Sequence, residues 1–285
     1  MTNSDAPVNQ TALQLIAVPL NSFLMGICFE ACTIGFFTSG ARLLDILYAK
    51  QKTESPFLTL LIVMFNLGAM ISLVVSVLTW IPLSETTCVP VDFLSNIAWH
   101  FYFIVFDVFI LYKSYIVTDK NAIYLWIATF SFLYRISWTI PDLMWTGGTW
   151  DPATETCIYN YNALTGFHYT IADILCDVVA TAGAVTMFMK PENRSLEFRS
   201  LWFQLMKENV LRSVICVIIN PFVMVMNKQG IDSNIMSLCY TAQNYTYVRL
   251  MNLEMYFKER RREITLPSRT GPKSSGSDKC EHMTV

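Results

Sequence analysis

Charged residues are scarce in this chain of 285 residues: Asp, Glu, Lys and Arg make up 15% of it, against 53% hydrophobic residues. A soluble domain carries about 25% charged residues. The apolar residues also gather in long blocks, which excludes a water-soluble domain with an unusually apolar core. A helix needs roughly 20 mostly apolar residues to cross the hydrocarbon of a bilayer. The composition therefore predicts an all-α membrane protein without a separate soluble domain.

The N-terminus lacks the basic residues that begin a cleavable secretion signal. The first ten residues are polar and carry Asp5 instead. We therefore expect the first apolar helix to act as its own uncleaved insertion signal.

Seven apolar blocks are long enough to span a membrane, and the strongest, residues 57–84, contains no charged residue. Lipid offers the backbone no hydrogen-bond partners, so blocks of this length should be helices. The sequence predicts a seven-transmembrane helix bundle over residues 20–257, after an external segment 1–19 and before a disordered cytoplasmic tail 258–285 rich in Pro, Ser and Gly. The predicted spans are residues 20–47, 57–81, 93–116, 122–145, 164–189, 205–226 and 235–257.

The sixth predicted span leaves the number of crossings open. Lys207, Glu208 and Arg212 interrupt its first third. A re-entrant segment at this place would reduce the count to six and put both termini on the same side of the membrane.

The distribution of basic residues predicts the orientation, because Lys and Arg collect in cytoplasmic loops. With the N-terminus outside, the external loops contain Lys228 as their basic residue, together with the acidic residues Asp5, Glu85, Asp92, Asp151, Glu155 and Asp232. The cytoplasmic segments then contain Arg42, Lys50, Lys52, Lys113, Lys120, Lys190, Arg194, Arg199, Lys258, Arg260, Arg261 and Arg262. Asn9 begins a glycosylation acceptor triplet in the external segment, although Asn193 and Asn244 begin similar triplets elsewhere.

Two of the eight cysteines, Cys88 and Cys157, fall in predicted loops, and both loops are external, where oxidation is permitted. One precedes the third span and the other lies in the long loop between the fourth and fifth spans. This arrangement, with seven spans and a basic, Ser-rich tail, resembles G-protein-coupled receptors and uncharacterised fungal seven-span proteins. The resemblance implies a Cys88–Cys157 disulfide, an external ligand and a cytoplasmic signalling partner. Two free thiols are the alternative.

Two receptor motifs are absent from the places where the resemblance requires them. The third span ends with Leu111-Tyr-Lys-Ser-Tyr115 in place of Asp/Glu-Arg-Tyr, and the seventh lacks Asn-Pro-x-x-Tyr. No sequence motif therefore supports coupling to a G protein.

Other seven-span classes lack their characteristic residues as well. The seventh span contains Arg249 but no Lys, so a retinal Schiff base has no partner there. Two membrane histidines, His100 and His168, are too few for the seven-span zinc hydrolases, although with Asp173 and water they would complete a zinc site. The Pro-Gln repeats of sugar carriers are missing. The sequence predicts no cofactor, no resident metal and no enzymatic activity.

Ionisable residues at membrane depth usually line the bundle interior in pairs or at polar cavities. Position along each helix predicts an outer ligand-binding cavity and a deeper switch in which Arg135 pairs with Asp107 or Asp177. The alternative is that the deeper group forms structural ion pairs. The cavity residues are Glu30, His100, Asp142, His168 and Asp173, and the switch residues are Asp107, Arg135, Asp177 and Arg249.

These features predict a receptor for an external ligand in the plasma membrane. Its expected partners are the lipid bilayer, that ligand and a cytoplasmic signalling protein, but no nucleic acid. A small-solute transporter or channel is the alternative, and a membrane scaffold is the third.

Overall fold

The computed structural model describes residues 6–48, 56–78, 84–153, 155–189 and 233–265, with isolated positions between 214 and 225. These residues are mostly helical. The helices are α1 (Ala6–Tyr48), α2 (Pro56–Leu78), α3 (Glu85–Val117), α4 (Ala122–Trp145), α5 (Ala163–Phe188) and α7 (Ser233–Thr265), and the strands are β1 (Gly147–Asp151) and β2 (Thr156–Asn160). Most of the sixth predicted span lies outside the described residues.

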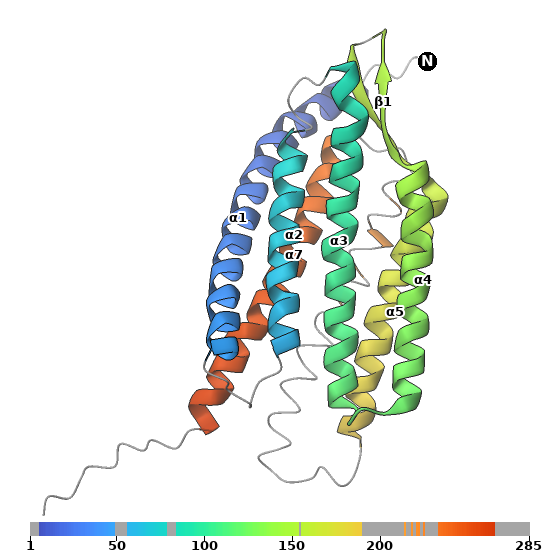
Figure 1. The fold of residues 1–285 in the computed structure, drawn as a ribbon. Coiled ribbons are helices and arrows are strands. Elements are labelled where there is room, and N and C mark those ends of the chain that lie inside the picture. Colours follow the sequence, from blue (N-terminus) through green and yellow to red (C-terminus); the bar gives the residue numbers. More distant parts are fainter. Residues whose placement is uncertain are drawn as a thin grey trace, which may run out of the picture.

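The described helices run side by side as an elongated bundle, with a β-hairpin at one end and the C-terminal end of α7 at the other (Figure 1). Helix α1 packs on α2 and α7, and α4 packs on α5. Helix α3 joins the two groups, because it contacts α2, α4, α5 and both strands. Side chains on α3 are therefore placed to meet groups from several helices at once.

Four of the described helices are long and apolar enough to cross a membrane: residues Ile16–Tyr48 of α1, all of α2, all of α3 and residues Ala163–Thr186 of α5. They indicate a membrane protein. Helices α4 and α7 are also long enough, with 24 and 33 residues, but polar side chains lower their hydropathy. In α4 these include the buried residues Ser131, Arg135, Thr139 and Asp142.

Helix boundaries differ from the prediction at both ends of the chain. Helix α1 begins at Ala6, so the segment predicted to precede the bundle is largely helical and contains Asn9. Helix α7 continues to Thr265, into the segment predicted to be a disordered tail. Its added residues include Glu, Lys and Arg, which favour helix more strongly than most polar residues.

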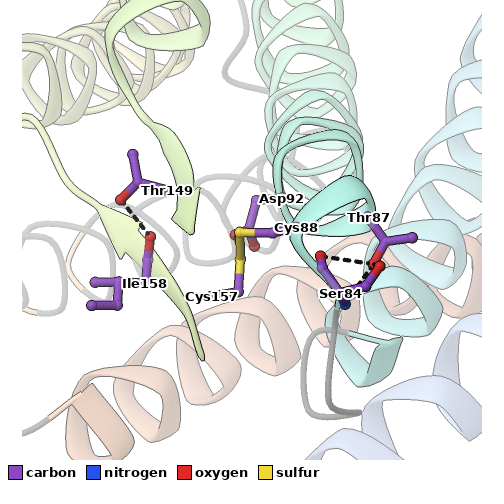
Figure 2. The surroundings of a disulfide bond; sticks show 7 residues. All are labelled: Ser84, Thr87, Cys88, Asp92, Thr149, Cys157 and Ile158. Carbon is purple, nitrogen blue, oxygen red and sulfur yellow. Dashed lines mark hydrogen bonds between the residues drawn. A yellow bond between two sulfur atoms is a disulfide. The ribbon is translucent and has the colours of Figure 1, made fainter. Parts of the chain in front are cut away.

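The loop between α4 and α5 forms an antiparallel hairpin in which Trp150 pairs with Cys157. Cys157 on β2 is joined to Cys88 in the first turn of α3 by a disulfide, with the two Cα atoms 5.5 Å apart. Figure 2 shows this bridge beside the carboxylate of Asp92. A Cβ atom on Gly148 would overlap that carboxylate, so glycine allows β1 to approach α3 closely. The bridge implied by the receptor resemblance is therefore present.

The core between α1, α2, α3 and α7 is aromatic and aliphatic, with Phe65, Phe103, Phe106 and Tyr247 buried together. Polar contacts also cross this core. The Asn66 amide nitrogen on α2 lies 3.0 Å from Oδ1 of Asn252 on α7, and the Asn252 amide donates to the Ala31 carbonyl of α1 at 3.1 Å. Amide hydrogen bonds of this kind hold helices together where apolar surface alone gives no preference over lipid.

Candidate functional site

The first polar site lies between α3, α4 and α5, where His100 meets Asp142. Nε2 of His100 is 2.8 Å from Oδ2 of Asp142, and both side chains are buried. A carboxylate only accepts hydrogen bonds, so this contact assigns a proton to Nε2. Nδ1 of His100 is buried and finds no hydrogen-bond partner within the described part of the chain. The Nε2 side of this imidazole is therefore fixed by a hydrogen bond, while Nδ1 can still act as an acceptor.

Asp142 is itself held in place, because its other oxygen accepts hydrogen bonds from two hydroxyl groups. Thr146, one turn further along the chain, donates to Oδ1 at 3.0 Å, and Thr165 in the first turn of α5 donates to the same atom. These hydrogen bonds connect the end of α4 to the start of α5, beside the hairpin. They also orient the carboxylate toward α3, so that the His100 ring is held in one position.

Aromatic rings enclose His100. Trp99 on α3 and Tyr169 on α5 make T-shaped contacts with the imidazole, with ring centroids 5.0 and 5.5 Å away. Tyr240 on α7 lies on Trp99, with the centroids of the two rings 6.4 Å apart. We call these five residues, His100, Asp142, Trp99, Tyr169 and Tyr240, the His100 site. Aromatic faces attract cations and apolar groups, so the site suits a ligand that presents a hydrogen-bond donor within an apolar or cationic frame.

The second polar site is an ion cluster around Arg135 on α4, whose side chain has no exposed surface. Nε of Arg135 lies 3.1 Å from Oδ1 of Asp173 on α5 and 3.5 Å from Oδ2 of Asp107 on α3. Nη1 donates to the Tyr169 carbonyl at 3.3 Å, and the guanidinium carbon lies 5.3 Å from the centroid of the Tyr169 ring. We call Arg135, Asp107 and Asp173 the Arg135 cluster. Tyr169 contacts both His100 and Arg135, so the two sites have this side chain in common.

The Arg135 cluster is electrically unusual, because one guanidinium faces two carboxyl groups. Its Nε and Nη2 atoms, Oδ2 of Asp107 and Oδ1 of Asp173 have no hydrogen bond of good geometry to another described residue. Breaking a buried ion pair by removing one partner costs about 3 to 5 kcal/mol, since the other charge remains desolvated. The cluster therefore couples α3, α4 and α5 strongly.

The structure separates the predicted cavity residues. His100 and Asp142 lie together, but Asp173 belongs to the Arg135 cluster. His168 stacks on Trp138 with ring centroids 3.7 Å apart, and its Nδ1 lies 3.1 Å from the Tyr134 hydroxyl. Glu30 is exposed on α1. Glu30 and His168 thus have surroundings other than the His100–Asp142 pair, because depth along a helix does not determine which face a side chain occupies.

The predicted switch residues are also only partly together. Arg135 meets Asp107 as predicted, and Asp177 is buried one turn from Asp173 on α5. Arg249 is exposed on α7, where Nε donates to the Tyr245 hydroxyl at 2.9 Å within the same helix. It belongs to a helix surface rather than to the deep ion pairs.

Metal-ligand spacing occurs once within the described ranges, at Cys88, Asp92 and Cys157. The two sulfur atoms are bonded to each other, so neither is a thiolate ligand. His100, His168 and Asp173 have separate partners and do not form the zinc set considered from the sequence.

Two helix contacts that involve α7 were not predicted from the sequence. Lys113 near the C-terminal end of α3 forms an ion pair with Glu254, and the Tyr102 hydroxyl donates to Asn244. Their polar character within helical segments was the available signal. Comparison with models of known protein families, and with curated protein sequences, finds no match for this chain.

Proposed function

We propose that this chain is a seven-span plasma-membrane receptor that binds an external ligand at the His100 site. The observation that carries this proposal is the buried His100–Asp142 pair, in which Asp142 fixes the ring and Nδ1 remains without a partner among the described residues. Buried polar atoms nearly always have hydrogen-bond partners. A ligand that donates a hydrogen bond to Nδ1 would supply the missing partner.

The position of the disulfide supports an external location for the hairpin end of the bundle. Disulfides form and persist in oxidising compartments, and Cys88–Cys157 ties the hairpin to the start of α3. The opposite end contains the turn after α3, with Lys120, and the end of α7, with Arg260 and its basic neighbours (Figure 1). Basic residues favour the cytoplasmic side. The chemistry of both ends therefore agrees with an external N-terminus and a cytoplasmic C-terminus.

The Arg135 cluster favours a second candidate function. Charges buried in a membrane bundle mark ion and substrate pathways in many transporters, and here they connect three helices. In a small-solute transporter these charges would lie along the route of the solute. In a receptor they would transmit a change at Tyr169 from the His100 site to the inner half of α3.

The two functions are distinguished by expressing the full chain in cells and applying a panel of small amines, amino acids and carboxylates. Solute uptake and recruitment of heterotrimeric G proteins are measured in parallel. The proposal predicts a compound that produces recruitment without uptake. Uptake without recruitment would contradict the receptor and support the transporter.

The variants His100→Gln and His168→Gln test the site itself. Glutamine at position 100 retains an amide donor where Nε2 meets Asp142, but its acceptor oxygen, Oε1, does not occupy the position of Nδ1. We therefore expect His100→Gln to reach the cell surface and to lose the response by at least tenfold in potency. His168→Gln, outside the His100 site, is the matched control and should retain the response. Equal potency in both variants would exclude Nδ1 as a ligand contact.

A further inference from the structure

The carboxyl groups of Asp107 and Asp173 lie close to each other as well as to Arg135. They come from different helices, α3 and α5, and both are buried. Each has an oxygen within 3.5 Å of the same atom, Nε of Arg135. A single cation thus faces two buried acids from two helices.

An ionised carboxylate accepts hydrogen bonds but cannot donate one. Two carboxylates in contact therefore repel, whereas one proton between them converts the repulsion into a hydrogen bond. We propose that Asp107 and Asp173 share one exchangeable proton beside Arg135, which makes the Arg135 cluster a proton-binding site between α3 and α5. With one proton bound, the acid pair carries one negative charge, which Arg135 balances.

The surroundings of the pair are consistent with this charge balance. Arginine stays protonated under all physiological conditions, so Arg135 supplies a constant positive charge. Asp177 lies one turn further along α5 and has interactions of its own. Charged and titratable side chains around the pair include Arg135 from α4, Asp177 and Cys176 from α5, and Tyr102 from α3. The Tyr169 ring of α5 packs on Arg135.

Binding and release of this proton would act on the packing of α3 against α5. When the proton leaves, two carboxylates face each other across the helix interface, and their repulsion favours separation of the helices. When it returns, the hydrogen bond forms again. The proposal concerns a proton rather than the ligand of the His100 site, so it stands or fails independently of the receptor function.

Infrared spectroscopy of the purified full chain in lipid nanodiscs tests the proposal directly. A protonated carboxyl group has a C=O stretching band apart from the amide bands, and the band shifts in D₂O. The proposal predicts this band in the wild type at neutral pH and its loss in both Asp107→Asn and Asp173→Asn. Asp45→Asn, an exposed position on α1, is the control and should keep the band. Absence of the band in the wild type, or its persistence in both cluster variants, would overturn the proposal.

The pH dependence of thermal unfolding provides a second readout. A proton held by the folded state stabilises it at low pH, and this contribution is lost as the pH rises and the proton leaves. The wild type should therefore melt at a lower temperature in alkaline buffer. Asp107→Asn keeps a neutral group of the same shape in the pair, so its melting temperature should fall less over the same range. An equal alkaline fall in both proteins would contradict a shared proton.

Discussion

Asp142 on α4 holds His100 on α3 through a contact of 2.8 Å between Oδ2 and Nε2, while two threonine hydroxyls occupy the other oxygen of the same carboxylate. This single side chain therefore joins the end of α4 to the middle of α3 and to the start of α5. Its loss should affect both the stability of the bundle and the orientation of the His100 ring.

The first prediction concerns Asp142→Asn. The amide replaces one acceptor oxygen with a donor, so at least one buried hydrogen bond is lost and its partner is left unsatisfied. We expect the free energy of unfolding to fall by about 1 to 3 kcal/mol, measured by thermal or detergent unfolding of the purified protein. Asp45→Asn, on an exposed surface, should change it much less. A variant as stable as the wild type would show that these hydrogen bonds are not formed.

A second prediction tests whether the pairing of opposite charges in the Arg135 cluster stabilises the protein. Arg135→Met leaves two acids beside an apolar side chain, and we expect a loss of about 3 to 5 kcal/mol in unfolding free energy. Adding Asp107→Asn and Asp173→Asn removes the stranded acids. The triple variant should therefore be more stable than Arg135→Met alone. If the added changes lower stability further, the cluster does not depend on paired charge.

Helix boundaries and buried helix faces were predicted correctly where the length and polarity of a segment determine them. Helix α4 begins and ends where the apolar block predicted, and α2 starts one residue from the predicted boundary. Asp173 and Asp177 are four residues apart, a spacing that puts both on one face of a helix, and both are buried. Charge-free length and helical periodicity are local properties, so they can be read along the chain.

The features that the sequence did not predict depend on how the helices are rotated about their axes and which helices pack together. Glu30 and Arg249 were placed by depth, yet both are exposed, because depth gives no information on rotation about the helix axis. The hairpin was expected as a plain loop, because β1 begins with two glycines, a residue that is depleted in strands. The Lys113–Glu254 contact joins residues 141 apart, and no local pattern links them.

The disulfide gives a third prediction. Replacing both Cys88 and Cys157 by serine frees the hairpin from α3, and the bridge closes a sequence separation of 69 residues. We expect a loss of about 2 to 4 kcal/mol in unfolding free energy. The intact bridge should also appear as a crosslinked peptide in mass spectrometry of non-reduced protein. Replacing the buried free thiol Cys176 is the control, and it should leave this peptide unchanged.

The fourth prediction uses charge exchange at the Lys113–Glu254 contact between α3 and α7. Both side chains of the Lys113–Glu254 pair are largely buried, so Lys113→Glu places two acids against each other. We expect this single variant to be destabilised and the double variant with Glu254→Lys to recover part of the loss. A double-mutant cycle on unfolding free energies gives the coupling directly. Coupling near zero would mean that the pair does not hold α3 to α7.

Topology mapping tests the central claim, a bundle of seven spans with the hairpin end outside. Glycosylation acceptor sites are introduced singly into the turn between β1 and β2, into the turn at Asp119 and into the tail after Thr265, and each protein is expressed in cells with a glycosylation pathway. The account predicts a glycan in the hairpin, and none at Asp119 or in the tail. A glycan at Asp119 would reverse the orientation, and one in the tail together with one in the hairpin would contradict an odd number of spans.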